Sequence, residues 1–431
     1  MTELLVFVGG LLVLMIIGLP VAVAIGITSF IALAVTGSGG LPVELLSLRV
    51  VQTLNNFTLL AIPLFILAAN IMNTGSTTTR IFDFATALVG FTRGGLGHAN
   101  VVASSIFATM SGTAVADAAG LGSIEIKAMK ERGYDLGYST GITAASSVIG
   151  PILPPSIALV VYGWLANVSI GALFVGGVLP GILMAMLLMG MTLILGARGS
   201  VAMPDPVPFD GREVLRTGRR AILPLIMPAI IVGGIWSGFF TPTEAGAVAS
   251  LYAAVLGGLV YRDLTPRAFF QAFQRTLMFS VAILLIISIS SFYGWILVRI
   301  GIPQALAAQI AGVELPTVLL LLGFALFFLL IGCFMSVVES ILIFTPIMVP
   351  AALAAGLDPL HFGIVMVITL SVGVITPPFG NVLFLMVAIT RLRYGQVVAS
   401  VLPFLIPILL TILLLIAIPP LATWLPALIG Y

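Results

Sequence analysis

Long apolar stretches, separated by short polar ones, follow one another from end to end of this 431-residue chain. Many hold about 20 residues or more, the length of helix that crosses the hydrocarbon core of a bilayer. The pattern therefore predicts an all-α polytopic membrane protein. Residues 4–36 are expected to form two short spans or one kinked helix, and 41–56 and 263–275 amphipathic interfacial helices. Uninterrupted spans are predicted over 57–72, 170–195, 221–239, 245–261, 277–297 and 397–425.

Two further apolar stretches, 139–165 and 361–390, are interrupted by prolines. The first contains Gly150-Pro151-Ile152-Leu153-Pro154-Pro155-Ser156, and the second contains Gly373-Val374-Ile375-Thr376-Pro377-Pro378-Phe379. Proline lacks a backbone N–H and clashes with the preceding helical turn. The backbone groups that it frees are tolerated at membrane depth only where protein or a water-filled cavity surrounds them. Both stretches are therefore predicted to be broken transmembrane helices.

Residues 96–130 and 316–355 are too interrupted to be single spans. Polar residues stand in the middle of each, Ser111-Gly112-Thr113 in the first and Ser336 in the second. The apolar arms on either side are short, as in re-entrant segments. We interpret each as a helical hairpin that enters the membrane and returns to the same side.

The order of elements repeats. Gly150 and Gly373 lie 223 residues apart, and the same interval joins Pro154 to Pro377 and Asp135 to Asp358. This predicts two repeats, 1–197 and 221–431, joined by a cytoplasmic linker over 198–220. Arg and Lys are enriched in cytoplasmic segments, and their positions give each repeat an odd number of spans. The repeats are therefore expected to have inverted topology, and both chain termini to lie outside the cell.

Composition excludes several classes of protein. Only 7% of the residues are charged and 60% are hydrophobic, and the formal net charge of +2 gives no indication of a nucleic-acid partner. The single cysteine, Cys333, rules out an internal disulfide and any site with several cysteine ligands. No organic cofactor is expected.

Broken helices in matching positions of two repeats mark the binding site of a transporter. Their free carbonyls favour cations, their free amides favour anions, and hard oxygen ligands suit Na⁺ as the coupling ion. The candidate sodium-binding residues are Ser111, Gly112, Thr113, Gly150, Pro151, Pro155, Ser336, Gly373, Thr376 and Pro378. An anionic substrate would use free N–H groups, Ser156 and Asn381. Asp117 and Glu339, acids in apolar surroundings, are further substrate-site candidates.

Four motifs together resemble the large membrane subunit of tripartite ATP-independent periplasmic (TRAP) transporters, over essentially the whole chain. They are Ser111-Gly112-Thr113-Ala114-Val115-Ala116-Asp117, the first proline motif from Gly150 to Ser156, Phe240-Thr241-Pro242-Thr243-Glu244-Ala245 and Thr376-Pro377-Pro378-Phe379-Gly380.

The resemblance implies a Na⁺-driven importer of organic anions, such as C4-dicarboxylates or sialic acid, in a bacterial inner membrane. The chain termini, placed outside by the Arg and Lys positions, would then be periplasmic. The resemblance also implies an extracytoplasmic substrate-binding protein and a small four-helix membrane subunit, here expected on a separate chain. By the same resemblance, a hairpin-bearing transport domain would move like an elevator against a scaffold of 4–72 and 221–297.

Three alternatives remain open at this point. A free-standing Na⁺/carboxylate symporter of the same fold would need no binding protein. An intramembrane hydrolase would use Asp117 and Glu339, but these acids are expected on hairpins that enter from opposite faces. A passive channel would conduct without saturation. The preferred interpretation is a transporter subunit rather than an enzyme.

Overall fold

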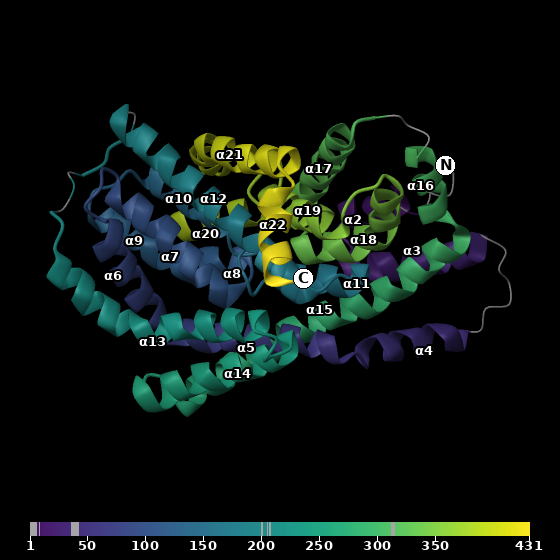
Figure 1. The fold of residues 1–431 in the computed structure, drawn as a ribbon, viewed down its shortest axis with the longest axis horizontal. Helices are drawn as coiled ribbons and strands as arrows, with labels where there is room; N and C mark the ends of the chain where they lie inside the picture. The colour runs from purple at the N-terminus through teal and green to yellow at the C-terminus, as the bar shows by residue number, and fades with distance from the viewer. Residues whose placement is uncertain are drawn as a thin grey trace.

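The computed structural model describes residues 7, 9–35, 43–199, 201–204, 206, 208–311 and 315–431, and over these residues the regular structure is entirely helical (Figure 1). Eight helices within this part are long and apolar enough to cross a membrane. The expected all-α polytopic membrane fold is confirmed. The beginning of the predicted segment 4–36, the stretch 36–42, the linker positions 200, 205 and 207, and residues 312–314 lie outside the described part.

The helices divide between the two predicted repeats. Those before residue 200 are α2 (Gly10–Ile16), α3 (Val21–Val35), α4 (Val43–Leu54), η2 (Phe57–Leu60), α5 (Ala61–Thr74), α6 (Thr77–Val89), α7 (Gly95–Ser111), α8 (Ala114–Ala119), α9 (Leu121–Glu131), α10 (Leu136–Ser147), α11 (Ile157–Ala166) and α12 (Ile170–Ala197). Those after it are α13 (Gly211–Trp236), α14 (Pro242–Val255), η3 (Leu256–Val260), α15 (Pro266–Ile300), α16 (Ile302–Ala311), α17 (Thr317–Phe334), α18 (Val337–Ala354), α19 (Pro359–Gly373), α20 (Asn381–Thr390), α21 (Tyr394–Ala417) and α22 (Pro420–Ile429).

All four interrupted segments are broken where the sequence pattern places the break. Helix α7 ends at Ser111 and α8 begins two residues beyond Gly112, while α17 and α18 are separated by Met335 and Ser336. The first proline motif separates α10 from α11, and the second separates α19 from α20. In both loops the Pro-Pro peptide bond is cis.

Three boundaries differ from expectation. Helix α15 runs unbroken over 35 residues from Pro266 and so includes residues 266–275 of the predicted interfacial segment 263–275, because no Gly or Pro separates them from the span that follows. Helix α13 begins at Gly211, inside the predicted linker 198–220, where Asp210 accepts a hydrogen bond from the N–H of Arg212 (2.9 Å). The predicted span 397–425 is two helices, because Pro419 and Pro420 end α21 and start α22.

Helices α4, α5, α13, α14 and α15 run along one edge of the molecule (Figure 1). Helix α5 packs against α14 and α15, and α15 also packs against α3 and α4. Polar contacts join these helices: Asn70 donates to Thr276 (3.0 Å), and the hydroxyl of Ser250 donates to the carbonyl of Leu64 (2.7 Å). The hairpins and broken helices lie together on the other side of this layer.

Candidate functional site

The tip of the first hairpin is a tight turn built by Gly112 and Thr113. Gly112 ends α7 with φ +64°, a left-handed conformation that glycine adopts without steric cost. Thr113 then caps α8, since its hydroxyl oxygen accepts a hydrogen bond from the N–H of Ala116 (3.2 Å). Gly112 and Thr113 thus form the turn between α7 and α8, and their backbone carbonyl and N–H groups lie at the tip of the hairpin.

This tip presses directly against the loop of the first broken helix. A Cβ atom added at Gly112 would lie 2.6 Å from the carbonyl oxygen of Pro155. One added at Gly150 would lie 3.0 Å from the carbonyl oxygen of Thr113. The two glycines therefore permit a backbone-to-backbone approach that any side chain would prevent. The predicted residues Gly112, Thr113, Gly150 and Pro155 come together.

Two serines at this junction are placed differently. Ser111 is only 5% exposed, and its hydroxyl oxygen has no hydrogen-bond partner in the described structure. An orphaned hydroxyl beside free carbonyls fits a cation with hard oxygen ligands. Ser156 is fully buried and is used within its own loop: its hydroxyl donates to the carbonyl of Pro151 and accepts from the N–H of Leu159.

The second hairpin meets the second broken helix in a similar way, at Gly332 and Gly373. A Cβ added at Gly373 would lie 2.4 Å from the Cα of Gly332. The N–H of Gly380 donates to the carbonyl of Cys333 (3.1 Å), and the rings of Phe334 and Phe379 lie 5.2 Å apart. The contact is thus formed by backbone near the tip and by an aromatic pair beside it.

Polar groups of this second junction partly cap their own helices. The N–H of Ser336 donates to Glu339 Oε2 (3.2 Å), which satisfies the start of α18. Thr376 donates its hydroxyl to the carbonyl of Val372 (2.8 Å), and the carbonyl of Pro378 accepts from the hydroxyl of Tyr394 (2.7 Å). The hydroxyl oxygens of Ser336 and Thr376 keep lone pairs that a cation could use.

Helices from the two halves of the chain also pack crosswise. Helix α11, the second half of the first broken helix, contacts α18 of the second hairpin. Helix α20, the second half of the second broken helix, contacts α8 of the first hairpin. Elements that are far apart in the sequence are thus neighbours in the fold.

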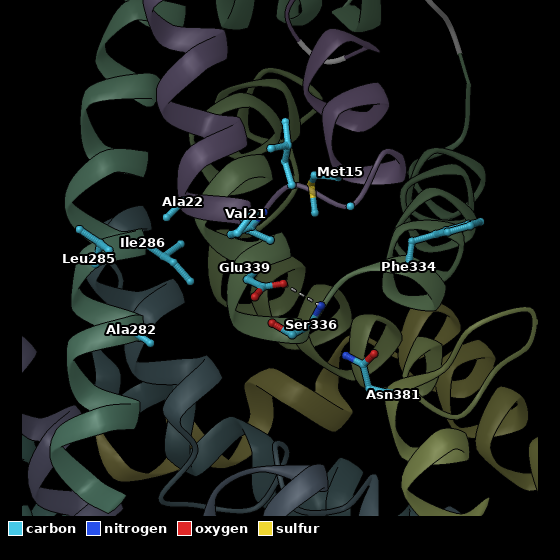
Figure 2. A pocket seen from close by; sticks show the side chains of 13 residues that line it. Met15, Val21, Ala22, Ala282, Leu285, Ile286, Phe334, Ser336, Glu339 and Asn381 are labelled. Carbon is cyan, nitrogen blue, oxygen red and sulfur yellow. Dashed lines mark hydrogen bonds between the residues drawn. The ribbon is translucent and has the colours of Figure 1, made fainter. Parts of the chain in front are cut away.

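A pocket of about 550 Å³ opens beside the second hairpin (Figure 2). Ser336, Glu339 and Asn381 form its polar side, and Figure 2 shows them on neighbouring elements, with Glu339 and Asn381 on either side of Ser336. The opposite walls come from the α2–α3 connection and from α15. Its apolar and glycine lining residues are Met15, Gly18, Leu19, Pro20, Val21, Ala22, Ala282, Leu285, Ile286 and Phe334. Three predicted site residues are thus brought together in a cavity of ligand size.

Asp117 does not line this pocket. It is 1% exposed on α8, and neither carboxylate oxygen has a hydrogen-bond partner in the described residues. Glu125 on α9 is fully buried and equally without partners. Sequence reasoning did not single out Glu125; an acid inside an apolar hairpin was the available signal.

Comparison with known proteins places this chain in a family. Residues 8–421 match the family model described as "Tripartite ATP-independent periplasmic transporter, DctM component". The chain is 40% identical to the sialic acid TRAP transporter large permease protein of Vibrio cholerae, covering 89% of this chain and 90% of that protein. It is 37% identical to the C4-dicarboxylate TRAP transporter large permease protein of Pseudomonas aeruginosa, covering 90% of each.

A solved structure supports the fold. The YdaH transporter of Alcanivorax borkumensis, described as having an unusual topology, superimposes with a TM-score of 0.66 over 87% of this chain and 88% of that one, at 16% identity. The sequence relatives are named as permeases rather than enzymes, which confirms the expected transport class. The chain belongs to the DctM family, the large permease component of tripartite ATP-independent periplasmic transporters.

Proposed function

We propose that this chain is the large membrane subunit of a Na⁺-driven secondary transporter that imports a small organic anion across a bacterial inner membrane. The anion is a carboxylate such as sialic acid or a C4-dicarboxylate, the two cargo classes named for the relatives above. Transport occurs in partnership with an extracytoplasmic substrate-binding protein and a small four-helix membrane subunit.

The observation that carries this proposal is the pair of junctions between hairpin tips and broken helices. Each junction gathers backbone carbonyls, N–H groups and hydroxyls with almost no charged side chain, which is the chemistry of a Na⁺ site at membrane depth. At the first, the unpartnered hydroxyl of Ser111 lies in the turn beside Gly112, which packs on Pro155. At the second, Ser336 and Thr376 provide oxygens next to the contact of Gly332 with Gly373.

The pocket beside the second junction is the proposed place of the organic anion. Its polar side belongs to the hairpin and the broken helix, and its apolar walls belong to α3, α15 and the connection before α3. Sliding of the hairpin-bearing part against these walls would carry the anion across. In this proposal the two repeats are inverted, α2–α5 and α13–α15 form the static scaffold, and both chain termini are periplasmic.

Coupling follows if Na⁺ orders the tips and the anion binds only to that ordered state. A cation then changes substrate affinity, and substrate changes cation affinity by the same factor. An acid-pair hydrolase would need Asp117 and Glu339 in one site. Glu339 lines this pocket and Asp117 does not, so the pocket does not pair the two acids.

Reconstitution in proteoliposomes tests the proposal. We expect uptake of radiolabelled N-acetylneuraminate or succinate only when an inward Na⁺ gradient, the binding protein and the small subunit are all present, with saturation kinetics. Uptake of free substrate by this chain alone would establish a free-standing symporter instead. Non-saturating conductance would establish a channel.

A further inference from the structure

The pocket described above contains a fixed negative charge and no fixed positive one. Among its lining residues Glu339 is the only ionisable side chain, and there is no Lys, Arg or His. The other two polar members, Ser336 and Asn381, are neutral. Any anionic cargo in this pocket must therefore lie beside a carboxylate, and its charge must be balanced by bound cations and by N–H donors.

Only one of the two carboxylate oxygens of Glu339 accepts a hydrogen bond from the described residues. Its Oε2 accepts the N–H of Ser336 (3.2 Å), whereas no described residue donates to its Oε1. The side chain is only partly buried, and Figure 2 shows its carboxylate at the pocket surface. An ionised carboxylate can only accept hydrogen bonds. The part of the cargo that meets Glu339 must bring O–H or N–H donors.

A second carboxylate on the cargo would be unfavourable at the same place. Like charges repel, and the repulsion is stronger in a partly water-excluded site than in bulk water. The apolar walls formed by residues such as Leu19, Leu285 and Ile286 cannot solvate a second charge either. They can pack against the C–H faces of a larger carbon skeleton, for which a volume of about 550 Å³ leaves room.

Asn381 can donate hydrogen bonds to the cargo, whereas Glu339 can only accept them. It is the first residue of α20, its side chain is exposed, and its amide group can donate to a single carboxylate. The helix N-terminus at the same position also favours an anion. A cargo with one carboxylate at Asn381 and hydroxyls toward Glu339 satisfies both residues.

We propose, on the basis of the transport function proposed above, that this pocket selects polyhydroxylated monocarboxylates over dicarboxylates and that Glu339 sets the preference. The relatives named above include permeases for both classes of cargo, and the lining of the pocket distinguishes between them. Sites that hydrogen-bond substrate hydroxyls reject analogues without them strongly, because the polar groups of the site are left unpaired.

The test measures dissociation constants of the full chain in lipid nanodiscs by calorimetry, with Na⁺ and with choline in its place. The probes are N-acetylneuraminate and D-gluconate as polyhydroxylated monocarboxylates, and succinate and fumarate as dicarboxylates. We expect at least one hydroxylated probe to bind more tightly than either dicarboxylate, by about tenfold or more, in Na⁺ only.

Three variants assign the effect to Glu339. Glu339→Gln keeps the cap of α18, because Gln serves at this position of a capping box, and it should reduce the preference about tenfold. Glu339→Asp retains the charge and should still disfavour dicarboxylates. Glu244→Gln is the matched control, since Glu244 accepts the N–H of Thr241 (2.8 Å) in an equivalent cap on the surface, and it should leave the preference unchanged.

Tighter Na⁺-dependent binding of succinate, or an unchanged preference in Glu339→Gln, would overturn the inference while leaving the transport proposal standing. An equal loss of affinity for all four probes in Glu339→Gln would also overturn it, because Glu339 would then act on the cation. Absence of Na⁺-dependent binding for every probe, both to the chain alone and to the chain assembled with the small membrane subunit, would instead contradict the proposed function itself.

Discussion

Gly332 and Gly373 are in backbone contact, although 41 positions separate them: a Cβ at Gly373 would lie 2.4 Å from the Cα of Gly332 and 2.3 Å from its carbonyl carbon. The second hairpin and the second broken helix thus meet without an intervening side chain. The proposed cation site at this junction requires such close approach, because its ligands would be backbone carbonyls of both segments.

Gly373→Ala is expected to separate the second hairpin from the second broken helix. Overpacking of a well-packed interior costs about 1–3 kcal/mol, and the displaced carbonyls should weaken Na⁺ activation of transport. Thermal unfolding in detergent and the Na⁺ dependence of uptake measure the two effects. The control is Gly395→Ala on α21, where nothing lies within 4 Å of an added Cβ. Equal behaviour of both variants would contradict the close contact.

Gly112→Ala tests the first junction. Gly112 has φ +64° and faces the carbonyl of Pro155, whereas Gly133 has φ +83° and open space around it. The left-handed backbone alone costs a non-glycine residue about 1–2 kcal/mol. Gly133→Ala should show only that cost, and Gly112→Ala should lose more stability together with Na⁺ activation. The comparison of melting temperatures is informative even if Gly112→Ala transports nothing.

Thr113→Val and Pro155→Ala should weaken Na⁺ dependence more than they weaken assembly. Valine removes the hydroxyl that caps α8, at a cost of about 1 kcal/mol, and removes a candidate oxygen ligand. Thr113→Ser keeps both functions of the hydroxyl and should behave nearly as the unmodified chain. Half-saturation of uptake by Na⁺ is the measurement, and unchanged Na⁺ activation in Thr113→Val and Pro155→Ala would reject the assignment of this cation site.

Asp263→Ala should loosen the junction of α5 with α6. One oxygen of Asp263 accepts both the N–H of Ser76 (2.7 Å) and its hydroxyl (2.8 Å). Hydrogen bonds to a charged group contribute about 1.5–3 kcal/mol when buried. This pair is partly exposed, so we expect the free energy of unfolding to fall by about 1.5 kcal/mol. Asp210→Ala, which removes an exposed cap of α13, is the control variant for the change in melting temperature. A smaller drop in melting temperature for Asp263→Ala than for Asp210→Ala would show that the hydrogen bonds from Ser76 to Asp263 do not stabilise this junction.

The interruptions in the fold could be read from the sequence because they have local causes. Pro154, Pro155, Pro377 and Pro378 cannot continue a helix, and Gly112 permits a left-handed turn, whatever surrounds them. Local signals also misled where they were weak. Residues 266–275 of the predicted interfacial segment are helical in either interpretation, and the missing breaker after Arg275 makes them part of α15.

The contacts within the candidate site follow from tertiary structure. The sequence places Ser336, Glu339 and Asn381 near breaks. The loop before α3 that helps to complete their pocket lies more than 300 residues before Ser336, and Ile286 on the contributing face of α15 lies 50 residues before it. Likewise, the burial of Asp117 and Glu125 without partners depends on how α8 and α9 pack.

Chain-local chemistry therefore determined the class of protein, the helices and the places where they break. Long-range packing decided which breaks meet, that Gly332 lies against Gly373 and Gly112 against Pro155, and that Glu339 rather than Asp117 lines the pocket beside the second hairpin. The reason is physical: helix formation and its interruption depend on neighbours within a few residues, whereas contact between distant segments depends on the shape of the whole fold.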